Sequence, residues 1–240
     1  MALSNNKINS FFNKTILKHP KKIYLLLLAF FSFATAFCQY PQISIATDLG
    51  LQRSFKKEQR YVAIGQTINA LFHFTPKDGV YVWFAYYTNG KFKNKLTATA
   101  KSPFTLPPQI NYINAAKMRI KHFSVGWRKY FVGSADTEKN WNLYGYGGLG
   151  ILMGRIENTH STAIDTLTYN VPVRSGVGNF KRLTLDLGLG WELPLGGSFY
   201  LYAEGRTWIP TTGYPSKYIF VNDNAPVVGM VNVGIRILFN

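Results

Sequence analysis

The chain has 240 residues, of which 27 are Lys or Arg and 11 are Asp or Glu, so its formal net charge at neutral pH is +16. This length suits one domain with a sizeable interior, and the charge suits an anionic partner, either nucleic acid or a membrane surface. The single cysteine excludes a fold stabilised by disulfides within the chain.

Residues 1–38 have the layout of a secretory signal peptide. A basic stretch without acids precedes the apolar run from Ile23 to Phe37, which is shorter than the about 20 residues of a transmembrane helix. The residues up to Cys38 form a suitable cleavage site, and the bulk of Phe37 disfavours a lipoprotein signal. We expect a cleaved leader and one mature domain, 39–240. An exported domain would meet an anionic membrane surface and no nucleic acid.

The mature sequence alternates in polarity with a period of two. From Leu183 to Leu193 every second residue is Leu or Trp, and the residues between them are polar or Gly. The segment from Val231 to Phe239 repeats this pattern. Successive side chains of a strand point to opposite faces, so both segments are predicted to be β-strands.

The same pattern predicts eight strands separated by turn residues. They cover residues 43–53, 60–75, 80–91, 117–132, 141–156, 181–193, 198–209 and 227–239. Short turns follow the even strands. Longer connections follow the odd strands, at 54–59, 92–116, 157–180 and 210–226. We therefore expect an all-β fold: an eight-stranded antiparallel transmembrane β-barrel with short periplasmic turns and long extracellular loops.

Alternation alone does not say which face points inward, and a soluble sandwich or lipocalin-like barrel would place its apolar face inside. Aromatic residues near the predicted strand ends favour a membrane barrel with interfacial girdles. On the periplasmic side these are Phe72, Phe74, Trp83, Tyr130, Phe131, Trp141 and Phe199, and on the outer side Tyr61, Tyr86, Tyr87 and Trp208.

The other face of the strands carries charges of both signs, which a narrow interior would force to pair. The predicted lumen charge network consists of Asp48, Arg128, Asp186, Glu192, Glu204, Arg206 and Arg236. Closure of the barrel would bring Arg236 near Asp48 or a neighbouring carboxylate.

The C-terminal segment resembles the β-signal of outer-membrane proteins, in which a polar residue and a Gly precede two apolar residues, the last one aromatic. These roles fall on Asn232, Gly234, Ile237 and Phe239. The whole mature chain resembles the small eight-stranded outer-membrane β-barrel proteins of Gram-negative bacteria, including the PorT-like group. The resemblance implies an integral outer-membrane location and handover to the barrel-assembly machinery. For the PorT-like group it also implies a link to a protein secretion machine.

The sequence GYGGLG, from Gly145 to Gly150, has the spacing of a dinucleotide-binding loop. Such a site needs a helix directly after the motif, but the residues that follow lack a helical apolar stripe. We expect these glycines to make room for bulky neighbours inside a tight barrel. No cofactor is predicted, and the separation of His73 from His160 predicts no metal site.

Two other activities would suit a small barrel. Eight strands leave an interior filled by side chains, which disfavours a narrow solute channel. Lipid A deacylases resemble the chain at His122-Phe123-Ser124, where the His and the Ser would be base and nucleophile and an acid such as Glu138 would orient the His. In the predicted register His122 and Ser124 face the lumen, away from an acyl chain. The interpretation that we favour is therefore a non-enzymatic one.

The predicted outer loops offer contacts for a protein partner. Loop 92–116 is stiffened by Pro103, Pro107 and Pro108 and presents Phe104, Ile110 and Tyr112 as contacts, although the same residues could pack as a lid over the barrel mouth. Loop 210–226 adds Tyr214, Tyr218 and Phe220.

Basic residues flank these loops, level with the phosphates of the lipopolysaccharide leaflet on the predicted topology. Each such residue is worth about 1 kcal/mol near an anionic surface, while the alternative is that they only keep the surface soluble. The rim predicted to contact lipopolysaccharide consists of Lys91, Lys93, Lys95, Lys117, Arg119 and Lys121. The third loop is bounded by Arg155, Lys181 and Arg182.

Overall fold

The computed structural model describes residues 42–55, 59–212, 217–218 and 227–239, so the predicted leader lies outside the described residues. The strands are β1 (Gln42–Ser54), β2 (Val62–His73), β3 (Asp78–Ala100), β4 (Gln109–Val132), β5 (Asn142–His160), β6 (Tyr169–Asn170), β7 (Gly176–Gly196), β8 (Phe199–Pro210) and β9 (Val228–Phe239). Helices long and apolar enough to cross a membrane do not occur in this part of the chain.

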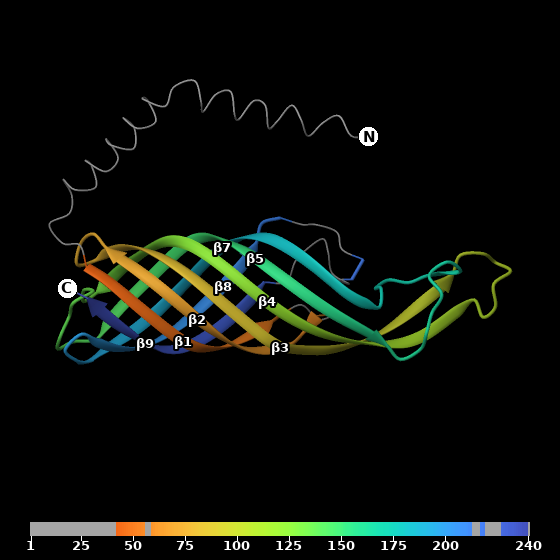
Figure 1. Ribbon diagram of the computed structural model, residues 1–240, viewed down its shortest axis with the longest axis horizontal. Helices are drawn as coiled ribbons and strands as arrows, with labels where there is room; N and C mark the ends of the chain where they lie inside the picture. The colour runs from red at the N-terminus through yellow and green to blue at the C-terminus, as the bar shows by residue number, and fades with distance from the viewer. Residues whose placement is uncertain (1–41, 56–58, 213–216, 219–226, 240) are drawn as a thin grey trace, which may run out of the picture. The chain divides into compact units, whose positions relative to one another are not determined.

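Eight of the strands close into a ring, which Figure 1 shows as a barrel of tilted strands. Neighbouring strands of the ring pair antiparallel, and β9 returns to β1 with a register from Ile43 opposite Phe239 to Ser54 opposite Val228. The two residues of β6 pair only with the end of β3. The predicted eight-stranded antiparallel barrel is confirmed.

The connections differ between the two ends of the barrel. Residues 74–77, 133–141 and 197–198 form the turn end. At the opposite, loop end the connections are 55–61, 101–108, 161–175 and 211–227. The two longest connections, 161–175 and 211–227, lie at the loop end as predicted, but 133–141 at the turn end is longer than 55–61 and 101–108, so the predicted alternation in length is only partly correct.

The predicted loop boundaries are wrong for the two middle hairpins. β3 and β4 stay paired as far as Thr99 opposite Gln109, well inside the predicted loop 92–116. β5 and β7 likewise stay paired as far as Asn158 opposite Gly176. The prolines of the predicted loop 92–116 all fall in the turn 101–108, where Pro cannot disturb a hydrogen-bonded ladder. Residues 91–117 and 157–176 are called the outer extension below.

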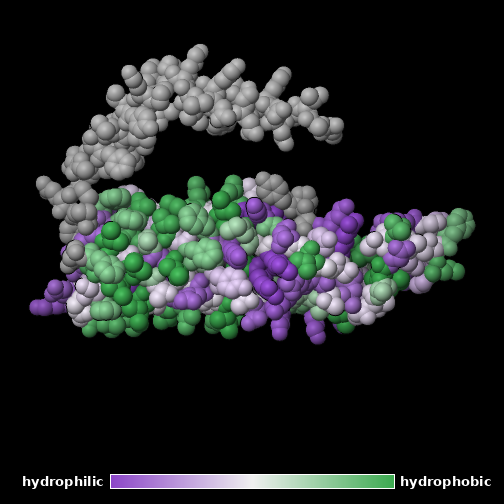
Figure 2. All heavy atoms as spheres, in the orientation of Figure 1, coloured by the Kyte–Doolittle hydropathy of each residue, from purple (hydrophilic) through white to green (hydrophobic). Residues whose placement is uncertain are grey.

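The outward face of the barrel is apolar. On β7 it presents alternate side chains, each between 37% and 62% exposed, namely Leu183, Leu185, Leu187, Leu189, Trp191 and Leu193. The span of residues 183–193 agrees with the 9–11 residues that a tilted strand needs to cross a bilayer. On the face that Figure 2 shows, hydrophobic residues cover most of the barrel surface.

The predicted aromatic girdles are only partly correct. Phe72, Phe74, Tyr86, Phe131, Trp141 and Phe199 are exposed on the outside. Five others point into the lumen and are at most 3% exposed: Tyr61, Trp83, Tyr87, Tyr130 and Trp208. Strand parity explains the error, because Tyr86 and Tyr87 are adjacent in one strand and cannot share a face.

The GYGGLG sequence lies within strand β5, so a dinucleotide-binding turn is excluded here. A Cβ atom at Gly148 would overlap the Tyr81 hydroxyl, and one at Gly150 would lie 2.5 Å from Asp186 Oδ2. These inward glycines therefore leave the room that the lumen side chains occupy.

Candidate functional site

The lumen near the turn end is organised around one arginine. Arg236 of β9 donates to Glu192 of β7 through Nε, 3.1 Å from Oε2, and through Nη2 to Oε1. Its Nη1 donates to Ser44 Oγ at 2.8 Å, and Nη2 also donates to the Ala135 carbonyl at 2.7 Å. The guanidinium carbon lies 3.9 Å from the ring centre of Tyr200. Every face of this buried cation is thereby occupied.

A second network fills the middle of the lumen. Arg206 Nη2 lies 2.7 Å from Asp48 Oδ2, and its Nε donates to Glu204. Arg128 approaches Glu204 at 3.8 Å from the other side. Asp48 also accepts hydrogen bonds from Asn232 at 2.5 Å and Tyr202 at 2.9 Å. The closure of the barrel thus pairs Asp48 with Arg206, whereas Arg236 pairs with Glu192.

The third group of polar residues lies closer to the loop end and is built around His122. Trp83 Nε1 donates to His122 Nδ1 at 3.0 Å, which leaves Nε2 to carry the proton of a neutral ring. Nε2 lies 2.9 Å from Thr184 Oγ1 and 3.4 Å from Asp186 Oδ1. The indole of Trp208 stacks on the imidazole at 3.9 Å. All seven predicted network residues are therefore buried in the lumen, in three groups along the strands.

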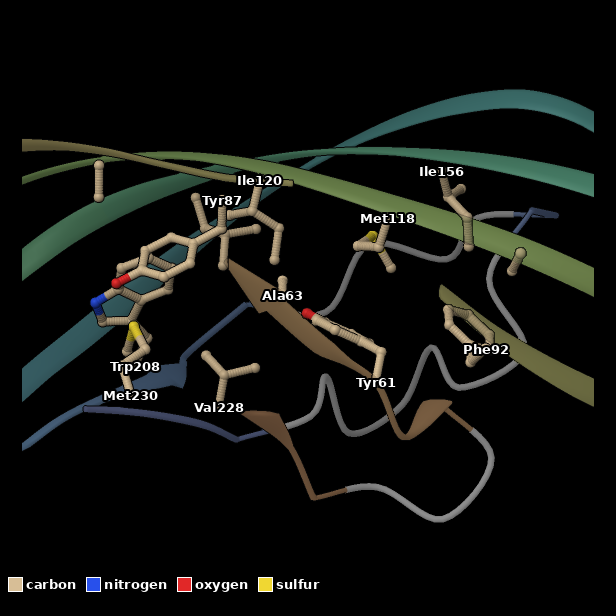
Figure 3. Packing of buried hydrophobic residues seen from close by; sticks show 13 residues of the cluster. Tyr61, Ala63, Tyr87, Phe92, Met118, Ile120, Ile156, Trp208, Val228 and Met230 are labelled. Carbon is tan, nitrogen blue, oxygen red and sulfur yellow. The ribbon is translucent and has the colours of Figure 1, made fainter. Parts of the chain in front are cut away.

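Above His122 the lumen becomes apolar. Figure 3 shows side chains from several strands pointing toward one another here, and Tyr61 stacks on Phe92 at 6.1 Å. The cluster comprises Tyr61, Ala63, Ala85, Tyr87, Phe92, Ala116, Met118, Ile120, Leu152, Ile156, Trp208, Val228 and Met230. The ionic networks nearer the turn end and this apolar cluster nearer the loop end together fill the described lumen, as expected for eight strands.

The residues of the deacylase-like motif do not form a catalytic arrangement. Ser124 Oγ donates to the Leu149 carbonyl at 3.2 Å, and both Ser124 and His122 are fully buried. Glu138, the acid suggested by sequence, is exposed in the turn 133–141 at the other end of β4, and the carboxylate beside His122 is Asp186. Among the described residues, no group of three or more His, Cys, Asp or Glu could hold a metal ion.

The four positions of the β-signal lie along the seam between β1 and β9. Asn232 points inward to Asp48, and Gly234 lies opposite Asp48, where a Cβ atom would meet the Asp48 Cβ at 2.6 Å. Ile237 and Phe239 lie on the outward face, with Phe239 49% exposed. In the folded barrel these residues therefore close the seam.

The predicted basic rim lies on the outward face of β3 and β4. Lys91, Lys93, Lys95 and Lys121 are exposed, whereas Lys117 and Arg119 are partly buried. Lys121 follows directly on the outward run Trp127, Val125 and Phe123 of the same strand. Two further cations belong to this surface, Arg155 on β5 and Lys181 on β7. Arg182, also expected near the rim, is only 2% exposed, because it shares the inward parity of Thr184 and Asp186.

The outer extension has a core of its own. Leu96, Ala98, Tyr112, Tyr169 and Val173 pack together there, so Tyr112 is unavailable to a partner, contrary to the prediction. Burial beside the Tyr112 ring lowers the pKa of His160.

At the tip of the extension Phe104, Leu106 and Leu167 are at least 83% exposed. Tyr218 packs against the apolar lumen cluster, while Tyr214 and Phe220 lie outside the described residues. Of the predicted contact residues that the structure describes, Phe104 is the most accessible to a partner.

Comparisons with known proteins identify the fold. No protein family and no curated protein matches the sequence. The crystal structure of Neisserial surface protein A is similar with a TM-score of 0.53 at 12% identity, over 82% of this chain and 97% of that chain. A major outer membrane protein from Thermus thermophilus gives 0.49 at 12%, over 84% and 100%. Ail of Yersinia pestis gives 0.47 at 14%, over 84% and 100%.

At these identities the likeness shows the fold alone. The chain has the fold of small eight-stranded outer-membrane β-barrels. The resemblance to the PorT-like group stays a prediction.

Proposed function

We propose that the mature chain is an integral, non-enzymatic protein of the Gram-negative outer membrane, with its loop end outside the cell. The observation that carries this proposal is a reversal of polarity along β4. Between Trp127 and Phe123 the outward side chains are apolar, and the neighbouring inward ones, Arg128 and His122, are polar. Between Lys121 and Lys117, nearer the loop end, the outward side chains are Lys or Arg, and the inward ones, Ile120 and Met118, are apolar.

Such an exchange of apolar and polar side chains between the two faces of one strand indicates a change in the medium around the barrel. A soluble barrel is surrounded by water along its whole length, so its outward face would stay polar. A membrane barrel has an apolar outward band and a polar interior, and it meets water again above the bilayer. The level of Lys121 therefore marks the outer edge of the apolar medium in this proposal.

The filled lumen supports a structural or interaction role. The ionic networks and the apolar cluster occupy the space that a solute would need, and His122 and Ser124 are shielded from any substrate outside. The surfaces left for function are the outer extension and the basic rim. We expect the rim to contact lipopolysaccharide, since each Lys or Arg near an anionic surface contributes about 1 kcal/mol.

Two protein partners remain predictions. The barrel-assembly machinery would read the C-terminal strand before Gly234 and Asn232 are buried in the seam. A component of a secretion machine, the role implied by the PorT-like resemblance, would meet the exposed tip at Phe104 and Leu106.

Location and orientation can be tested together with single cysteines. Thr105→Cys places a thiol at the tip of the extension, and Lys77→Cys places one in a turn at the opposite end. In intact cells a membrane-impermeant maleimide should label the first variant and spare the second, while both should react after lysis. The parent protein controls for Cys38. The protein should fractionate with the outer membrane, and unboiled samples should migrate differently from boiled ones in detergent gels.

Recovery in the soluble periplasm with one mobility before and after boiling would contradict the proposal. Labelling of Lys77→Cys alone would reverse the orientation.

A further inference from the structure

The outward surface around the barrel's outer edge has a distinct order across four strands. The register aligns Phe84, Phe123, Ile151 and Leu183 in one cross-strand row of β3, β4, β5 and β7. The next outward row consists of Tyr86, Lys121, Met153 and Lys181. The row after that contains Arg119, Arg155 and Asn179. One step along the strands thus changes a fully apolar row into a cationic surface.

The cations of this surface are close enough to repel one another. Arg119 and Arg155 lie directly opposite each other, which places their Cβ atoms about 5 Å apart. Lys121 and Lys181 flank Met153 at a separation of about 10 Å. Glu157 lies 3.4 Å from Arg119 and 3.3 Å from Arg155, so it compensates part of this charge. Like charges directly opposite in a sheet are destabilising, and an anion bound between them would remove that cost.

The same residues line a groove of about 1250 Å³. Arg119, Lys121, Arg155 and Lys181 come from its strands, and Lys217 comes from the connection before β9. The backbone carbonyls of Lys217 and Tyr218 accept hydrogen bonds from Arg174 and Asn158, each at 2.7 Å. None of the described residues lining the groove is acidic. The groove therefore combines concave shape with positive charge.

We propose that this groove is a binding site for a phosphate group of an outer-leaflet glycolipid such as lipopolysaccharide, an inference that rests on the proposed outer-membrane location. Arg119, Lys121, Arg155 and Lys181 hold the phosphate, and the acyl chains lie along the row from Phe84 to Leu183. Arginine suits this ligand because its guanidinium can donate two parallel hydrogen bonds to phosphate oxygens.

The apolar row selects a lipid over a free anion. A free phosphate would gain nothing from the side chains of Phe123 and Ile151 one step away, whereas acyl chains would remain in contact with them. The lysines farther out, Lys91, Lys93 and Lys95, belong to the extension, where their partners on β4 are Lys117, Ala115 and Ile113 in place of a continuous apolar row. The site is therefore a localised part of the basic rim.

Two variants with equal charge loss test the site. The site variant carries Lys121→Gln, Arg155→Gln and Lys181→Gln and keeps Arg119 to neutralise Glu157. The control carries Lys91→Gln, Lys93→Gln and Lys95→Gln. Parent and variants are purified in a neutral detergent and titrated with lipopolysaccharide, with lipopolysaccharide stripped of its phosphates, and with inorganic phosphate. The readout is the temperature at which the folded gel band is lost, because a ligand of the folded state raises it.

Intact lipopolysaccharide should stabilise the parent and the control. Each removed cation weakens binding about fivefold, so the site variant should need on the order of a hundredfold more lipid.

Equal weakening of both variants would overturn the localised site but leave a diffuse basic rim. Equal stabilisation by phosphate-free lipid would overturn phosphate recognition, and this titration needs only the parent if the variant fails to fold. Equal stabilisation by inorganic phosphate would identify a free anion as the ligand. Failure of the outer-membrane proposal itself would appear separately, in fractionation and labelling of the parent.

Discussion

The barrel and the outer extension are built from the same strands but have opposite interiors. On β4 the inward residues of the barrel include Arg128 and His122, whereas those of the extension include Tyr112. The outward residues change in the reverse sense, from Trp127 to Lys117. Strand geometry is the same in both regions, so the change in polarity must reflect what surrounds each of them. The outward face of the barrel suits an apolar medium, and the outward face of the extension suits water.

The two interiors also differ in how they are held together. In the barrel, ion pairs such as Arg236 with Glu192 connect strands that are distant in sequence. In the extension the core is a small cluster around Leu96 and Tyr112, supplemented by local hydrogen bonds such as that from Tyr169 to the Pro107 carbonyl at 3.0 Å. Damage to the lumen should therefore weaken the whole barrel, and damage to the extension should remain local.

The largest effect is expected in the lumen. Arg236→Ala leaves Glu192 buried without its cation, which should cost about 3 to 5 kcal/mol of unfolding free energy. Lys95→Ala, on the exposed face of the extension, should change it by no more than about 0.5 kcal/mol. Denaturant unfolding of the barrel in lipid vesicles measures both. Equal midpoints for Arg236→Ala and the parent would show that the lumen network does not stabilise the barrel.

A second comparison places the same new charge on the outward face of each region. Leu187 on the barrel and Ile113 on the extension are similarly exposed, at 41% and 44%. Leu187→Arg should cost about 2 to 4 kcal/mol because a lipid-facing Arg near the midplane is strongly unfavourable. Ile113→Arg should be close to neutral, since its surroundings are aqueous. The same vesicle unfolding experiment applies, and equal costs would argue against a membrane boundary between the two positions.

The seam offers a smaller and purely steric test. An added methyl at Gly234 would press on Asp48, whereas nothing lies within 4 Å of a Cβ atom at Gly205 on the outward face of β8. Gly234→Ala should cost about 1 to 3 kcal/mol through overpacking, and Gly205→Ala should be neutral or slightly stabilising. The melting temperature of the folded gel band reports both. A neutral Gly234→Ala would mean that the seam is less tightly packed than the lumen geometry indicates.

The smallest effect concerns pH and the extension. Burial lowers the pKa of His160, so protonation favours the unfolded extension. Stability should fall as the pH drops below the unfolded value of about 6.5. Because the ring is partly exposed, we expect only a few tenths of a kcal/mol, about the size of a weak surface interaction. Amide exchange of residues 109–116 should accelerate at acidic pH in the parent but not in His160→Gln. Equal acceleration in both would assign the effect to other groups.

Much of the site could be read from strand parity. Asp186, Glu192 and Arg236 fall on the polar face of their strands, and the structure places all three in the lumen. Parity would also have identified Arg182 as inward and separated Tyr86 from Tyr87. The partners of these residues could not be derived in this way, because Arg236 and Glu192 meet across β8, at a distance set by closure of the ring.

The amino-acid sequence by itself determined that the chain beyond the predicted leader forms strands, how many of them make up the ring and, between bulges, which residues share a face, because side-chain direction in a regular strand follows residue number. Only the tertiary structure decided where the lumen ends. On β4 the alternation continues unchanged from the barrel into residues 109–117, whereas on β3 a bulge between Tyr87 and Gly90 shifts the inward positions from odd to even residue numbers. The apolar face turns from outward to inward because the strands pass from a ring with an apolar exterior into a hairpin with a core of its own. Each strand has an apolar face and a polar face. Which of the two points inward depends on whether the outward face meets an apolar medium or water after folding.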